Sequence, residues 1–90
     1  MDFVHYDLSQ LRGGETVEVT LDHAANVRLL DDSNFSGYRS GRQYSFFGGH
    51  VTQSPYRIRV PHGGHWHLVI DLGGYSGQVR SGVRVMEADA

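Results

Sequence analysis

The fold is decided by one stretch, Pro61-His62-Gly63-Gly64-His65-Trp66-His67-Leu68-Val69-Ile70-Asp71-Leu72, which is followed at once by Gly73-Gly74. It contains the only tryptophan, three of the six histidines and the longest run of residues that favour β-strands. Successive side chains of a strand point to opposite faces, so one face is apolar and carries Trp66, Leu68, Ile70 and Leu72. The other face carries His65, His67, Val69 and Asp71. The stretch therefore predicts a half-buried strand that Trp66 anchors in the core.

The same alternation recurs along the rest of the chain. It is clearest from Glu15 to Asp22, where Val17, Val19 and Leu21 face one way. Four Gly-Gly pairs supply the positive φ angles that tight turns need. Further strands are expected at residues 2–8, 27–30, 43–47 (burying Tyr44 and Phe46), 56–60 and 79–85, and residues 8–11 are a candidate helical turn. We predict an all-β fold, a small antiparallel β-sandwich (jelly-roll-like) of about six to eight short strands, with a barrel as the alternative.

Length and composition bound the class of protein. Ninety residues correspond to a single domain, residues 1–90, with one modest core. The chain has no cysteine, no signal peptide and no apolar run that could cross a membrane, so we expect a cytoplasmic protein with no membrane partner. The formal charge of −2 argues against nucleic acid as a partner.

Several motifs together point to a known family. The run Val27-Arg28-Leu29-Leu30-Asp31-Asp32-Ser33-Asn34-Phe35, the segment Gly64-His65-Trp66-His67 and the segment Ile70-Asp71-Leu72-Gly73-Gly74 resemble a bacterial family known as domain of unknown function 1883. The resemblance spans nearly the whole chain and implies a small stand-alone β domain. Some relatives are attached to signalling or immune-type domains such as TIR, which implies a recognition module in bacterial signalling or defence. On this basis we expect a non-enzymatic binding module without a cofactor, whose ligand is a protein or a small molecule.

The sharpest candidate for chemistry is the set His65, His67 and Asp71. Period-two geometry places all three on one face of one strand. Two imidazoles and a carboxylate suit a divalent metal such as zinc, iron or nickel. The spacing loosely resembles the first metal-binding motif of cupins, which makes a cupin-like metal-binding protein or enzyme the alternative function. The competing interpretation is that these three side chains form the solvated face of a half-buried strand.

The second candidate is the polar connection from Asp31 to Arg42, which we expect to be a loop. It carries Phe35, Tyr38, Arg39 and Arg42, residues suited to stacking on a sugar or base and to clamping an anion. The competing interpretation is structural: the aromatic side chains tuck back to seal the edge of the sandwich, and the arginines are solvated.

Two further surfaces are open interpretations. Arg57 and Arg59 would converge with Arg80 and Arg84 on a phosphate or an acidic partner if their strands were neighbours. An exposed edge strand would allow self-association into a homo-oligomer.

Overall fold

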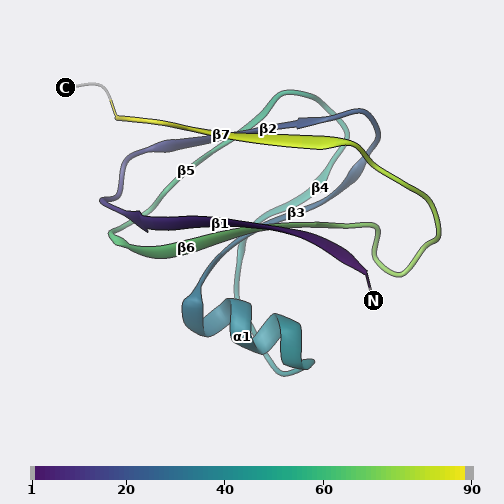
Figure 1. Ribbon diagram of the computed structural model, residues 1–90, viewed down its shortest axis with the longest axis horizontal. Helices are drawn as coiled ribbons and strands as arrows, with labels where there is room; N and C mark the ends of the chain where they lie inside the picture. The colour runs from purple at the N-terminus through teal and green to yellow at the C-terminus, as the bar shows by residue number, and fades with distance from the viewer. Residues whose placement is uncertain (1, 89–90) are drawn as a thin grey trace.

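The computed structural model describes residues 2–88, which form two antiparallel sheets and one helix (Figure 1). The larger sheet has the strand order β1-β6-β3-β4 and the smaller has the order β5-β2-β7. The strands are β1 (Phe3–Leu11), β2 (Thr16–Leu21), β3 (Ala25–Asp31), β4 (Phe47–Val51), β5 (Tyr56–Arg59), β6 (Gly64–Asp71) and β7 (Ser81–Met86), and helix α1 spans Asp32–Ser40. The predicted all-β sandwich is confirmed, and the described residues form no closed barrel.

The main core lies between the two sheets, and β6 is central to it. Trp66, Leu68 and Ile70 are at most 1% exposed on the face of β6 that meets the smaller sheet. The smaller sheet contributes Val17 and Val19 from β2, both fully buried. The indole Nε1–H of Trp66 donates a hydrogen bond to the backbone oxygen of His62 (3.1 Å), so its one polar group is satisfied. The prediction that Trp66 is a core anchor is confirmed.

Residues 32–40 form helix α1, so the prediction of a loop from Asp31 to Arg42 is wrong. Asp31 caps the start of the helix: its carboxylate accepts a hydrogen bond from the backbone N–H of Asn34 (2.9 Å). Gly41 ends the helix in the left-handed conformation at φ 75°, and its N–H bonds back to the last turn. Asp31 and Gly41, which resemble turn residues in the sequence, therefore cap the two ends of a short helix.

Helix α1 covers the outer face of the larger sheet and creates a second, smaller core (Figure 1). Phe35 and Tyr38, three residues apart on the helix, pack against Leu30 and Val69 of the sheet. The face of β6 that carries His67 and Asp71 is therefore buried, with exposures of 6% and 2%. The expectation of a solvated face is therefore wrong for His67 and Asp71, because the helix excludes water from them, whereas the side chain of His65 is 36% exposed.

Strand β1 continues through residues 8–11, for which a helical turn was an alternative prediction from the sequence. The pairing with β6 shifts between Asp7 and Ser9, so Leu8 is the extra residue of a β-bulge. Ser9 adopts φ 63°, and its N–H donates to the carboxylate of Asp7 (2.8 Å). The bulge changes the spacing of inward side chains, so that both Leu8 and Leu11 contact the main core.

Strand β4 begins later than expected. The sequence predicted a strand at residues 43–47 with Tyr44 and Phe46 buried, but β4 starts at Phe47, Tyr44 is half-buried and Phe46 is 39% exposed. Gly48 lies within this strand opposite Arg28, and a Cβ at Gly48 would lie 2.2 Å from the backbone oxygen of Val27. This Gly-Gly pair allows close strand pairing and does not make a turn.

No helix within residues 2–88 is long and apolar enough to cross a membrane.

Candidate functional site

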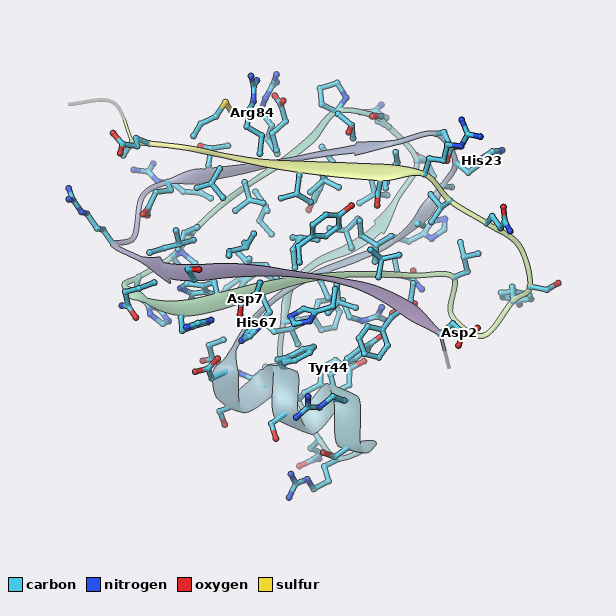
Figure 2. The ribbon with its side chains drawn as sticks, viewed as in Figure 1. Asp2, Asp7, His23, Tyr44, His67 and Arg84 are labelled. Atoms are coloured by element: carbon cyan, nitrogen blue, oxygen red, sulfur yellow. The ribbon has the colours of Figure 1, made fainter. Side chains whose placement is uncertain are left out.

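Histidine and aspartate side chains gather on the outer face of the β1–β6 pair, next to the start of helix α1 (Figure 2). At the centre is His67, whose Nε2 lies 2.5 Å from Oδ1 of Asp32 and whose Nδ1 lies 2.9 Å from Nε2 of His5. An ionised carboxylate can only accept, so Nε2 of His67 carries the proton. In the neutral imidazole, Nδ1 then has the lone pair and accepts from the Nε2–H of His5.

Asp7 and His65 form the second half of this cluster. Nε2 of His65 donates to Oδ1 of Asp7 at 2.6 Å, and the rings of His65 and His67 stack with centroids 5.0 Å apart. One ligand atom from each of Asp7, His65 and His67 lies within 4.8 Å of the others. Asp7 is next to the β1 bulge, whose residue Ser9 holds its carboxylate in place.

The packing and hydrogen bonds of the cluster shift the pKa values of His5 and Asp7. The ring of Phe35 stacks on His5 (4.2 Å between centroids) and on His67 (4.4 Å). Burial, reinforced by the charges of His67 and Arg39, lowers the pKa of His5, and the nearby carboxylate of Asp7 only partly opposes the shift. The hydrogen bond from the backbone of Ser9, together with His65, lowers the pKa of Asp7.

The structure does not bring Asp71 to the two histidines, although the sequence grouped it with them. Asp71 lies four residues beyond His67, which along a strand is about 13 Å at Cα. Its side chain is fully buried and its two oxygens accept four hydrogen bonds, from Asn26 (2.9 Å), Gly73 N–H (2.8 Å), Tyr38 (2.7 Å) and Arg28. The carboxylate of Asp71 is a structural hub that joins β6 to β3 and α1. The acidic residue that lies beside the two histidines is Asp7 of β1.

Strong electrostatic effects surround Asp71. Burial alone would raise its pKa, but the hydrogen bonds from Asn26, Tyr38 and Gly73 and the positive charge of Arg28 outweigh this, so the pKa lies below its usual value. Burial, together with the hydrogen bond to Asp71, raises the pKa of Tyr38 well above its ordinary value. The guanidinium of Arg28 lies over the rings of Tyr38 (5.6 Å) and Phe46 (5.1 Å).

The four residues predicted as a ligand platform do not share one open surface. Phe35 and Tyr38 are 7% and 8% exposed and pack against the sheet, as the structural interpretation expected. Arg39 is exposed, with its guanidinium 5.4 Å from the centre of the Phe35 ring, and Arg42 is exposed beyond the helix end.

The arginines considered for an anion site do not form a free positive surface. Strand β2 lies between β5 and β7, and its Glu18 makes ion pairs of 2.9 Å with Arg57 on one side and Arg84 on the other. The carboxylate balances one of the two positive charges and engages both guanidinium groups.

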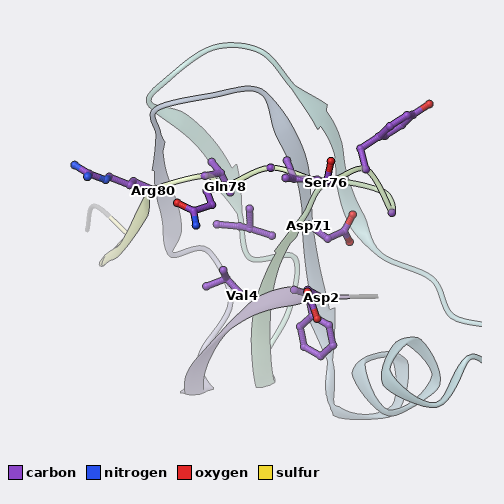
Figure 3. Close-up of a pocket in the computed structure, with 13 residues that line it drawn as sticks. Asp2, Val4, Asp71, Ser76, Gln78 and Arg80 are labelled. Carbon is purple, nitrogen blue, oxygen red and sulfur yellow. The ribbon is translucent and has the colours of Figure 1, made fainter.

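A pocket of about 760 Å³ lies at one end of the sandwich, between the start of β1 and the loop from β6 to β7 (Figure 3). Apolar groups from Phe3, Val4 and Val79 line it together with the polar groups of Gln78 and Arg80. Sequence reasoning missed this site. The available signal was the glycine-rich segment 73–77, which contains Tyr75, a tyrosine that is 84% exposed.

Fold and site define the class of protein: a small antiparallel β-sandwich whose larger sheet is covered by one helix over a polar, histidine-rich cluster. The chain belongs to the family described as domain of unknown function DUF1883, whose profile matches residues 1–89. The family resemblance drawn from the sequence motifs is thereby confirmed. Comparison with curated proteins and with solved structures gives no match.

Proposed function

We propose that the protein is a non-enzymatic binding module that accepts a small ligand in the pocket between β1 and the β6–β7 loop. The observation that carries this proposal is the pocket itself, whose volume of about 760 Å³ falls within the range of small-molecule sites, roughly 300–1,000 Å³. Its lining combines apolar surface with a few polar groups, which suits a ligand that has an apolar body and hydrogen-bonding substituents.

The chemistry of the lining favours binding over catalysis. Asp71 is the buried carboxylate of the pocket wall, and all its hydrogen-bonding capacity is taken by Asn26, Gly73, Tyr38 and Arg28. A general acid or base must be free to exchange a proton with substrate, and this group is not. A saturated carboxylate suits a recognition module, and the family resemblance implies that this recognition serves signalling or defence.

A ligand screen tests the proposal. Purified protein is heated in the presence of a library of nucleotides, sugars and metabolites, and compounds that raise the melting temperature are followed by amide NMR. We expect binding compounds to shift resonances of Val4, Gln78 and Arg80, and Arg80→Ala to weaken binding at least tenfold. Arg57→Ala is the matched control, because Arg57 is an exposed arginine paired with Glu18 on the smaller sheet. Ligand shifts confined to α1 and Arg42, with full affinity retained in Arg80→Ala, would overturn the pocket proposal.

A further inference from the structure

The cluster beside helix α1 has the composition of a metal site. We propose that Asp7, His65 and His67 bind one divalent ion of the zinc type. This site is separate from the pocket, because none of the three residues lines it. Asp7 comes from β1 and the two histidines from β6, so the site exists only when this strand pair has formed.

The ligand atoms are near enough for side-chain rotation to bring them onto one ion. Zinc lies about 2.0–2.2 Å from histidine nitrogen and carboxylate oxygen in tetrahedral sites, so two ligand atoms on one ion are about 3.3–3.6 Å apart. In the protein the three candidate atoms lie within 4.8 Å of one another. The side chains of Asp7 and His65 are 53% and 36% exposed, so a small rotation of either closes the difference. Zinc would take the position of the proton that His65 now donates to Asp7, and that proton would move through solvent to Nδ1 of His65, which keeps the imidazole neutral.

His67 is prepared as a ligand by its other neighbours. Its Nε2–H is donated to Asp32 (2.5 Å), which leaves the lone pair on Nδ1. Metal-binding histidines commonly donate their second nitrogen to a carboxylate in this way, which fixes the tautomer and makes the ligand more basic. The stacked ring of Phe35 holds the imidazole plane. In the ion-free protein the lone pair on Nδ1 accepts the hydrogen bond from Nε2–H of His5 (2.9 Å), which an ion on Nδ1 would displace.

The position of Asp7 is also fixed before any ion binds. The β1 bulge at Leu8 brings the N–H of Ser9 to 2.8 Å from the Asp7 carboxylate, which orients it toward His65. Bulges often serve to aim a side chain at a functional site. Two side chains held by neighbouring groups and one partly exposed ring make a site that needs little ordering when the ion enters.

Calorimetric titration with zinc chloride tests the proposal on protein that carries no histidine tag. We expect one ion per chain, and at least tenfold weaker binding in both Asp7→Asn and His65→Gln. Both substituted positions are partly exposed, so these variants are expected to keep the wild-type circular dichroism spectrum. His23→Gln is the matched control, because His23 lies 3.1 Å from Asp22 in an exposed histidine–aspartate pair outside the cluster. Its affinity is expected to stay within twofold of wild type.

A spectroscopic measurement on the wild type supplies a second test that needs no variant. Zinc should move the ring-nitrogen NMR resonances of His65 and of Nδ1 of His67, and leave those of His23 unchanged. Failure of zinc to bind, equal weakening in His23→Gln, or wild-type affinity in both Asp7→Asn and His65→Gln would overturn the site. Because no pocket residue is altered, these outcomes are independent of the ligand screen.

Discussion

Tyr38 donates a 2.7 Å hydrogen bond to the buried carboxylate of Asp71, and this contact ties helix α1 to the central strand of the larger sheet. The same carboxylate oxygen pairs with Arg28 of β3. One acidic side chain therefore connects three elements that lie far apart in the sequence, and it does so beneath the helix, where an unpaired charge would be costly.

Removing the hydroxyl of Tyr38 measures the strength of this connection. Tyr38→Phe keeps the ring packed but leaves Asp71 without one of its donors, so we expect the free energy of unfolding to fall by about 1–3 kcal/mol. Urea denaturation followed by circular dichroism provides the measurement. Tyr44→Phe is the control: Tyr44 packs edge-on against Tyr38, and its hydroxyl makes no hydrogen bond within residues 2–88. Equal stability losses in the two variants would show that the bond to Asp71 contributes nothing specific.

The lowered pKa of Asp71 predicts loss of stability in acid. In the folded protein Arg28, Tyr38, Asn26 and Gly73 face this group and hold its pKa below the unfolded value of about 3.9. Its contribution to stability is therefore complete above the unfolded pKa and is lost as the pH falls through the folded pKa. Carbon-detected NMR titration should show that the carboxyl of Asp71 ionises at a lower pH than that of a normal aspartate. A titration midpoint at or above the normal aspartate value would contradict the conclusion that hydrogen bonds and Arg28 stabilise the ionised carboxylate of Asp71.

Helix α1 should be held by its buried aromatic face and not by its arginines. Phe35→Ala removes a ring that is 7% exposed and stacks on His5 and His67, so we expect a loss of about 3–5 kcal/mol. Arg42→Ala changes an exposed side chain beyond the helix end and should alter stability by less than about 0.5 kcal/mol. Thermal unfolding of both variants distinguishes a docked helix from a free ligand-binding loop, for which the two substitutions would have similar effects.

The sequence predicted the sandwich because the alternation of β6 and β2 is a local property. It did not predict that the second face of β6 is buried, because the side-chain partners of His67 and Asp71 are 33 to 62 residues away in the chain. A polar side chain on a strand reads as solvated unless those partners are known. The helix was missed for a related reason: Asp31, Asn34 and Gly41 are typical of turns, and only their spacing around Phe35 and Tyr38 indicates capped helical ends.

The histidine–aspartate cluster was partly visible in the sequence. His65 and His67 are two residues apart and therefore share a face, which is a local inference. The third member depends on strand pairing: Asp7 is directly opposite His67, while Asp71 is about 13 Å further along the same strand. Strand order cannot be derived from alternation, so Asp7 could only be found once β1 was placed beside β6.

The close pairing of β3 and β4 predicts that Gly48 cannot be replaced. A Cβ there would lie 2.2 Å from the backbone oxygen of Val27, and φ at Gly48 is 126°. Gly48→Ala should therefore destabilise the protein by about 1–3 kcal/mol or more, since two backbones must separate. Gly49→Ala is the adjacent control for backbone conformation: φ at Gly49 is also positive (159°), but a Cβ there meets no atom within 4 Å, so this variant lacks the clash. Equal denaturation midpoints for the two variants would show that β3 and β4 are not packed this closely.

Asp32 provides the last prediction, because it acts on the proposed ion only through His67. Asp32→Ala removes the acceptor of the His67 Nε2–H and frees the ring to adopt either tautomer, so we expect zinc affinity to fall about 10- to 100-fold with one ion still bound. Ser33→Ala, at the next exposed position of the same helical turn, controls for changes in helix stability. Titration calorimetry gives the affinities, and ring-nitrogen NMR of the zinc-free protein should report a mixture of His67 tautomers in Asp32→Ala alone. Unchanged zinc affinity together with a single His67 tautomer in Asp32→Ala would show that Asp32 does not position His67 for the ion.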